Sequence, residues 1–170
     1  MQSSVVTYFE DFAVGDTYEH SRGRTVTDFD NYSITHMSLN TAQAHFNLPY
    51  SQQLLDGRFR ERIVVGLCTI GIVVGLTSQD MSENAFMDIG LTGIRLHNPV
   101  FAGDTLHARS EVLSAEEDPM RSDTGIMRYR FSATNQDGKL VAEGERTVRL
   151  KKRSSWEERD KIAQQEGVAI

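Results

Sequence analysis

The sequence predicts an α+β fold in which one antiparallel sheet wraps around a single long helix. Residues 63–78 are apolar on nearly every side, which is typical of a buried helix or of a long buried strand. From Ala85 onward, apolar and polar residues alternate in several segments, with the period of a half-buried strand. Residues 135–138 separate two of these segments with hairpin-loop residues, so the strands are expected to pair antiparallel.

The N-terminal part is expected to form a strand followed by a short helix. The strand is placed near Tyr18–Val26, and Thr27 follows it as a suitable helix N-cap. Asp28 and Asp30 would then lie in the first turn, where the helix dipole favours acidic side chains. These features predict a helix over Asp28–Met37.

Two segments between this helix and the strands differ in character. Residues 40–62 show little periodicity and contain Pro49 and Gly57, so we interpret them as a partly helical loop that is long enough to suggest a function. Residues 63–78 are β-branched and apolar, but strands rarely exceed about 10 residues. A buried central helix is therefore the better interpretation of residues 63–78, with its glycines allowing close packing.

The remaining strands are placed by their alternation. Apolar residues alternate over Met87–Leu96, Leu106–Val112, Met127–Ala133 and Leu140–Leu150. Gly93 suggests a bulge in the first of these segments. Pro99–Asp104 is interpreted as a turn, and Ser114–Thr124 as a polar loop.

The chain is expected to divide into a domain over residues 1–153 and a short charged helix or tail over residues 154–170. Ser154 and Glu157 resemble a capping box that opens this helix, which has few apolar residues to bury. About five antiparallel strands around one buried helix form a hot-dog fold, and this is the fold predicted for the domain.

The composition limits the classes of partner. The 170 residues are enough for one domain, with 39% apolar and 25% charged residues, as in globular proteins. The formal net charge of −6 does not attract nucleic acid or an anionic membrane. Such a surface would also repel coenzyme A unless basic side chains cluster around its binding site.

Cysteine and histidine usage narrows the chemistry further. Cys68 is the only cysteine, which indicates a reducing compartment, and its apolar surroundings should keep the thiol protonated. The absence of a signal-peptide pattern and of an apolar run of about 20 residues predicts a cytoplasmic protein. The five histidines have no metal-ligand spacing, so no metal site is expected.

Residues 8–152 resemble the MaoC-like dehydratases, a family that includes R-specific enoyl-CoA hydratases and mesaconyl-CoA hydratase-like proteins. The resemblance is strongest over Gly93–Leu106, which is similar to the strand, PV…GDTL turn and next strand of that family. Ile63–Leu67 resembles the start of the family's central helix, and Thr25–Asp30 resembles the entry to its first helix. The resemblance implies a hot-dog domain that acts on an acyl thioester.

The family's catalytic signature is an Asp followed five residues later by a His, in a pattern close to D-x-N-P-x-H. Asn40 and His45 have this spacing, with Asn40 in the place of the Asp and Ala42-Gln43 in the place of the Asn-Pro pair. The resemblance implies that the backbone N–H of Gly66 polarises the thioester carbonyl. His45 is the expected acid–base group, and Asn40 can orient water but cannot accept a proton. Each of these residues also has a purely structural interpretation.

The substrate is expected to contact residues beside these groups. Tyr32 is a candidate for the pocket lining, as are Val65 and Leu67 on either side of Gly66. Arg58 and Arg62 precede the central helix and could meet the phosphates of coenzyme A, although such basic runs are usually solvated surface.

Three functions fit the sequence. The first is an enoyl-thioester hydratase or dehydratase, a lyase that uses His45 and Gly66. The second is a thioesterase, for which Glu61 is the nearest acid, or a lyase that adds another nucleophile. The third is a non-catalytic acyl-binding partner. We expect no cofactor besides coenzyme A or acyl carrier protein as the substrate carrier, and a homodimer or a dimer of dimers with its pockets at the dimer interface.

Overall fold

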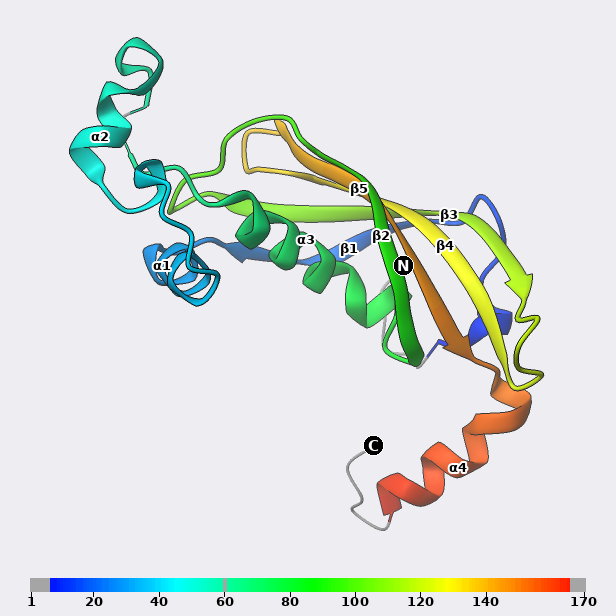
Figure 1. Ribbon diagram of the computed structural model, residues 1–170. Helices are drawn as coiled ribbons and strands as arrows, with labels where there is room; N and C mark the ends of the chain where they lie inside the picture. The colour runs from blue at the N-terminus through cyan, green and yellow to red at the C-terminus, as the bar shows by residue number, and fades with distance from the viewer. Residues whose placement is uncertain (1–6, 60, 166–170) are drawn as a thin grey trace.

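The computed structural model describes residues 7–59 and 61–165, and it shows a five-stranded antiparallel sheet that curves over one long helix (Figure 1). The strands are β1 (Thr17–Thr25), β2 (Ala85–Leu96), β3 (Thr105–Glu117), β4 (Thr124–Thr134) and β5 (Leu140–Lys151). Their order in the sheet is β1-β3-β4-β5-β2, so β1 and β2 form the two edges. The helices are α1 (Asp28–Met37), α2 (Leu48–Gln53), α3 (Gly66–Met81) and α4 (Arg153–Gln165), with short 3₁₀ turns η1 (Phe9–Asp11), η2 (Gln43–His45) and η3 (Leu54–Gly57). The predicted α+β hot-dog fold is confirmed.

The core lies between the concave face of the sheet and α3. Alternate side chains of the three central strands are buried, as their sequence pattern predicts. The fully buried apolar side chains include Leu106, Val112, Met127, Tyr129, Phe131, Val148 and Leu150. From α3, Val73 and Met81 complete this layer with no exposed surface. Figure 1 shows α1 and α2 near the end where α3 begins, and α4 beyond the opposite end of the sheet.

The first helix forms where the sequence predicts it, over Asp28–Met37. The Thr27 hydroxyl accepts the Asp30 backbone N–H, and the Asp30 carboxylate accepts the Thr27 N–H at 2.8 Å. Arg24 donates to the same carboxylate. Burial opposes ionisation of Asp30, but the bonds from Thr27 and Arg24 outweigh it and hold the pKa of this carboxyl below its usual value.

The central helix is shifted relative to its predicted range, because it spans Gly66–Met81 and not residues 63–78. Ile63 forms a β-bridge with Phe101, and the Val64 N–H donates to the carbonyl of Val100 at 2.9 Å. These β-branched residues therefore stay extended, in the conformation that suits their side chains. As a result, Gly66 becomes the first residue of the helix.

Two other boundaries differ from the prediction, and one irregularity is confirmed. β3 continues to Glu117, so Ser114–Glu117 is strand and not loop; a register shift after Val112 breaks the alternation that marked the strand. α4 begins at Arg153, which places Ser154 inside the helix and not ahead of it as an N-cap. The predicted bulge at Gly93 is present, with φ at 61° and a register shift against β5.

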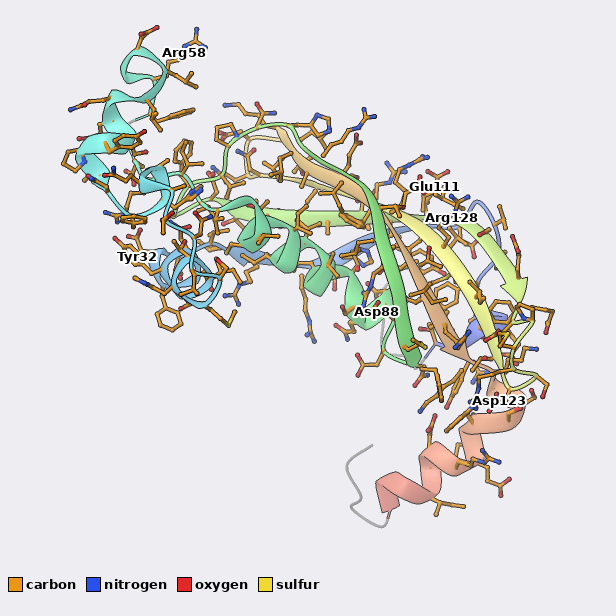
Figure 2. The ribbon with its side chains drawn as sticks, in the orientation of Figure 1. Tyr32, Arg58, Asp88, Glu111, Asp123 and Arg128 are labelled. Atoms are coloured by element: carbon orange, nitrogen blue, oxygen red, sulfur yellow. The ribbon has the colours of Figure 1, made fainter. Side chains whose placement is uncertain are left out.

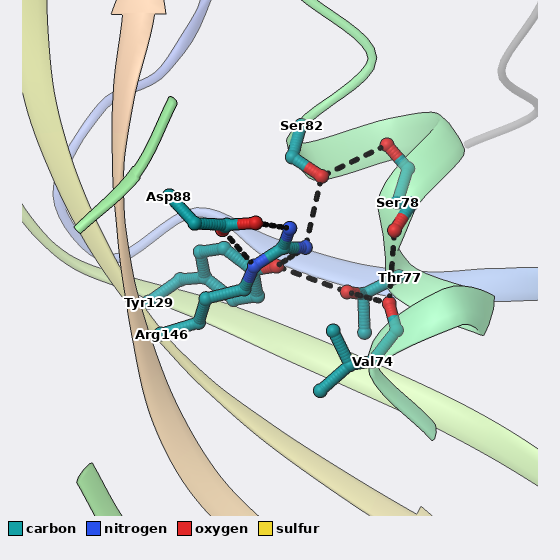
Figure 3. A network of polar contacts seen from close by, with 7 residues as sticks. All are labelled: Val74, Thr77, Ser78, Ser82, Asp88, Tyr129 and Arg146. Carbon is teal, nitrogen blue, oxygen red and sulfur yellow. Dashed lines mark hydrogen bonds and ion pairs between the residues drawn. The ribbon is translucent and has the colours of Figure 1, made fainter. Parts of the chain in front are cut away.

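A polar network anchors the C-terminal end of α3 to the sheet (Figure 3). The Arg146 guanidinium donates twice to Asp88 on the edge strand β2, at 2.7 and 2.9 Å. It also donates to the hydroxyls of Ser82 at 2.9 Å and Tyr129 at 3.1 Å, and Tyr129 shares a 2.9 Å hydrogen bond with Thr77. The network joins α3 to β2, β4 and β5. None of the helices in the described ranges is long and apolar enough to span a membrane.

Candidate active site

The candidate site is assembled at the N-terminal end of α3 by a buried side chain of α1. Asn31 is 1% exposed, and its amide N–H donates to the carbonyl of His45 at 2.7 Å. Its amide oxygen accepts the backbone N–H of Val65 at 2.9 Å. One side chain therefore ties α1, the η2 turn and the start of α3 together. Asn31 was not predicted as a site residue; its signal in the sequence is a polar residue four positions before Thr35, which is also buried on α1.

His45 is half-buried at the end of η2, with one ring nitrogen engaged. Its Nδ1 lies 2.8 Å from the carbonyl oxygen of Ile63. Because a carbonyl oxygen only accepts, the neutral ring must carry its hydrogen on Nδ1, and the lone pair is left on Nε2. This is the tautomer that a general base needs when Nε2 faces the substrate.

Gly66 occupies the first position of α3, where helix geometry leaves the backbone N–H without an intrahelical acceptor. A Cβ atom at this position would lie 2.4 Å from Cδ1 of Leu96 on β2. The glycine leaves room for this side chain, and an alanine here would require the exposed Leu96 side chain to move. The same position offers an N–H at the positive end of the helix dipole, which suits a developing oxyanion.

Asn40 lies just after α1 and closes a turn with its own side chain. Its amide oxygen accepts the N–H of Ala42 at 2.9 Å, and its backbone N–H donates to the carbonyl of Thr35 at 3.0 Å. The preceding residue, Leu39, adopts a φ of 53°, so the chain reverses sharply here. With its oxygen in this turn, Asn40 has the two hydrogens of its amide group to offer a substrate or a water, besides the second lone pair of the oxygen.

Of the five residues predicted to bind substrate, four lie at or beside the start of α3, and Arg58 lies apart from them. The Arg62 guanidinium lies 5.2 Å from the centre of the Tyr32 ring, beside the start of α3. Leu67 is 63% exposed on the first turn of α3, whereas Val65 is buried with its N–H bonded to Asn31. Figure 2 shows Arg58 at the outer tip of the segment that contains α2, far from Tyr32 on α1. The structure therefore does not bring Arg58 and Arg62 together into one cluster of basic side chains.

The other reactive side chains have surroundings that do not suit catalysis. Burial raises the pKa of the Cys68 thiol, as predicted from its apolar neighbours. Glu61, the acid considered for a thioesterase, is exposed. Within residues 7–59 and 61–165, no group of three or more His, Cys, Asp and Glu side chains is arranged to hold a metal ion.

Comparison with known proteins decides the family. A sequence profile of mesaconyl-CoA hydratases matches residues 5–152. The chain belongs to this family. It is 36% identical to the β-methylmalyl-CoA dehydratase of Chloroflexus aurantiacus over 126 residues, and 33% identical to the mesaconyl-CoA hydratase of Cereibacter sphaeroides over 143 residues. These alignments cover 74% and 77% of this chain but only 35% and 39% of the two relatives.

A solved structure agrees with this assignment. A MaoC domain protein dehydratase from Chloroflexus aurantiacus superposes with a TM-score of 0.80 and 30% identity, over 88% of this chain and 46% of that one. The resemblance to MaoC-like dehydratases is therefore confirmed. The chain spans less than half the length of these relatives.

Proposed function

We propose that this protein hydrates enoyl thioesters reversibly. The observation that carries the proposal is the bond between His45 Nδ1 and the Ile63 carbonyl, which leaves the lone pair of the neutral ring on Nε2. Asn31 holds this histidine next to the start of α3, where the first N–H groups lack intrahelical acceptors. An acid–base group beside an oxyanion donor is the pair that addition of water to a thioester requires.

The proposed reaction gives each of these groups a role. The Gly66 N–H donates to the thioester oxygen and stabilises the enolate, for which one such donor contributes about 2.7–4 kcal/mol. His45 Nε2 takes a proton from water while the water oxygen bonds to the β-carbon. The protonated ring then delivers that proton to the α-carbon, so the elements of water are added and His45 returns to its starting state. The Asn40 amide hydrogens orient the water oxygen.

The competing functions predict different uses of Asn40. A thioesterase requires a group that directs water to the thioester carbonyl, usually a carboxylate, whereas Asn40 carries an amide and Glu61 is exposed. A lyase that adds another nucleophile would tolerate an amide at this position. The names of the relatives, a hydratase and a dehydratase of CoA thioesters, favour water as the nucleophile and coenzyme A as the carrier.

We also propose that the working unit is a homodimer in the cytoplasm. β2 is an edge strand with partly exposed apolar side chains, namely Phe86, Met87, Ile89, Leu91, Ile94 and Leu96. Such an edge normally pairs or is covered. A second copy joined at β2 would supply a second hot-dog unit and border Gly66 through Leu96. The single, buried Cys68 suits a reducing compartment.

The test follows enoyl absorbance and thiol release separately with crotonyl-, mesaconyl- and longer enoyl-CoA substrates. We expect loss of the enoyl absorbance with the thioester intact. Release of free thiol would identify a thioesterase instead. The variant Asn40→Asp sharpens the test, because a carboxylate should keep or raise hydration of crotonyl-CoA if water is the native nucleophile, and damage the native reaction if it is not.

The assembly is tested by light scattering of the parent and of Leu91→Glu, with Glu61→Gln as a surface control. We expect a dimer or a multiple of dimers for the parent and the control, and a shift to monomer with loss of activity for Leu91→Glu. A parent that stays monomeric at micromolar concentration would contradict both the dimer and a pocket at its interface.

A further inference from the structure

A groove separates the edge strand β1 from the middle and later turns of α3, which runs beside it (Figure 1). Its volume is about 570 Å³, which lies within the range of small-molecule sites, about 300–1,000 Å³. β1 lines the groove with Arg22 and Arg24, and α3 lines it with Gly71, Ile72, Gly75 and Leu76. Among the described residues, no acidic side chain lines it.

The two arginines point toward α3 and away from the convex face of the sheet. Gly23 lies between them, and a Cβ atom on Gly23 would lie 2.5 Å from Cε1 of His107, an exposed residue of β3. Successive residues of a strand point to opposite faces of the sheet. Arg22 and Arg24 therefore project on the face opposite to His107, where they reach the groove.

Arg22 lacks the carboxylate partner that most arginines of this protein have. Arg109 and Arg130 on the convex face pair with nearby acids, and Arg24 donates to Asp30 through one Nη group. Arg22 has no hydrogen-bond or ion-pair partner in the part of the chain that the structure describes. The groove thus gathers two cations without acids, which is what a chain with a net charge of −6 needs in order to attract an anion.

The α3 side of the groove is small and apolar. Gly71 and Gly75 are exposed and lie one turn apart, and a Cβ atom at either position would meet no atom within 4 Å. The backbone of α3 is therefore open to a slender ligand, and Ile72 and Leu76 add apolar contact surface. An apolar floor beside a cationic wall suits an anion that is joined to a narrow, partly apolar chain.

The groove begins close to the proposed position of the thioester. Gly71 is five residues after Gly66, which corresponds to about 7.5 Å along the helix axis. Burial raises the pKa of the Cys68 thiol and the charge of Arg24 opposes this rise, so Arg24 lies near the first turns of α3. Gly66 faces β2 through Leu96, whereas the groove faces β1. A thioester held at Gly66 can therefore extend its acyl group on one side of α3 and its carrier on the other.

We propose that this groove binds coenzyme A, with the pantetheine arm along Gly71 and Gly75 and the phosphates at Arg22 and Arg24. This inference rests on the proposed function and names the residues that hold its carrier. The arm is narrow and carries methyl groups, which match the open helix backbone and the apolar floor. It also sets the phosphates apart from the thioester, as the arginines are set apart from the start of α3. Guanidinium groups bind phosphate oxygens through pairs of parallel N–H groups.

The kinetic test uses two thioesters of one acyl group. Crotonyl-CoA carries the phosphates, and crotonyl-N-acetylcysteamine lacks them. Arg22→Gln should raise KM for crotonyl-CoA by about fivefold, the upper range for one exposed ion pair, and Arg22→Gln/Arg24→Gln should raise it further. Neither variant should change KM for the short thioester. Added salt should raise KM for crotonyl-CoA in the parent and have little effect on it in the double variant.

Two controls separate phosphate binding from other roles of these arginines. Arg109→Gln removes an arginine of similar exposure to Arg24 from the convex face, and it should leave KM for crotonyl-CoA unchanged. Asp30→Asn releases Arg24 from its ion pair but keeps the guanidinium, so KM for crotonyl-CoA should not rise. A rise in Asp30→Asn equal to that in Arg24→Gln would mean that Arg24 only supports α1, and it would contradict the assignment of Arg24.

A substitution on α3 tests the groove without removing a charge. Leucine favours a helix more than glycine does, and the space beside Gly75 is open, so Gly75→Leu should fold with an equal or higher melting temperature. Its side chain should occupy the path of the arm and raise KM several-fold more for crotonyl-CoA than for the short thioester. Ser154→Leu adds the same side chain to an exposed position of α4 and serves as the control. An unchanged KM for crotonyl-CoA in Gly75→Leu would show that the arm binds elsewhere.

Calorimetry with coenzyme A itself distinguishes failure of this inference from failure of the proposed function, because free coenzyme A has no double bond to hydrate. We expect the parent to bind coenzyme A and Gly75→Leu to bind it more weakly. Arg22→Gln/Arg24→Gln should lose affinity by about 10- to 25-fold, the upper range for two exposed ion pairs. This pattern without hydration of any enoyl thioester would refute only the proposed function. A parent that does not bind coenzyme A, or equal affinity in the parent and both variants, would refute the inference.

Discussion

The two ends of α3 each place a histidine among hydrogen-bonding neighbours, but they use it differently. At the N-terminal end, His45 is half-buried and bonds through Nδ1 to a backbone carbonyl. At the C-terminal end, His20 is buried, with Nδ1 at 2.6 Å from Asp80 Oδ2 and Nε2 at 2.8 Å from the hydroxyl of Ser110. The second arrangement has the order of groups found in a hydrolytic triad.

Access decides which of the two is a candidate for catalysis. Ser110 is 1% exposed and His20 is 6% exposed, so a substrate does not reach this cluster. His20 lies in the part of β1 where the register against β3 shifts, between Glu19 and Gly23. Its side chain points inward, toward α3 and β3. The Arg146 network at the same end of α3 is also largely buried (Figure 3). Polar groups that are paired and buried hold the fold, whereas groups with unused hydrogen-bonding capacity are available for chemistry.

The largest effect that this comparison predicts is on turnover at the N-terminal end. His45→Ala should lower kcat by about 100- to 10,000-fold, the range for one general acid–base group, with little change in melting temperature. The rate of crotonyl-CoA hydration at saturating substrate measures this change in kcat. If the His45→Ala enzyme is as fast as the parent, His45 has only a structural role.

At the C-terminal end of α3, replacing the histidine by alanine should lower the stability of the protein. His20→Ala leaves the buried Asp80 carboxylate without its partner, which should lower the free energy of unfolding by about 3–5 kcal/mol. The kcat per folded molecule should stay close to that of the parent. Urea unfolding followed by circular dichroism, with assays well below the transition, provides both numbers. Loss of activity in a fully folded His20→Ala protein would break the distinction between the two ends.

Substitution of Gly66 tests whether this residue serves packing, catalysis or both. Gly66→Ala forces its new Cβ against Leu96, and a displacement of about 1 Å in a bound substrate costs roughly 100-fold in rate. The double variant with Leu96→Ala relieves the clash. We expect it to restore the melting temperature but not kcat/KM. Full recovery of kcat/KM in the double variant would mean that Gly66 serves packing alone.

The smallest effect concerns the helix that supports the site. Asp30→Asn weakens the capping box of α1 and should cost about 1 kcal/mol at neutral pH. The folded-state pKa of Asp30 is depressed, so its contribution is present above the unfolded pKa of about 3.9 and is lost as the pH falls through the folded value. The stability difference between parent and variant should therefore shrink below about pH 4. A difference that does not depend on pH would assign the effect to helix propensity.

Local signals in the sequence determined much of this protein. Thr27 and Asp30 define the start of α1 because their side chains bond to backbone groups three residues away. The alternation over Met127–Ala133 identifies a strand because successive side chains point to opposite faces of a sheet. The spacing of Asn40 and His45 marked them as candidates, since both lie in one short connection and the resemblance to a family gave that spacing a meaning.

Only the tertiary structure decided the features that depend on contacts between distant segments. Val64 bonds to Val100, so α3 begins three residues later than its apolar run suggests. Asn31 serves the site because the nitrogen and the oxygen of its side-chain amide bond to His45 and Val65 at once. His20 and Asp80 are 60 residues apart, and no local pattern shows that they meet. Periodicity and capping report the interactions of a segment with itself, whereas these pairs depend on how the sheet curves over α3.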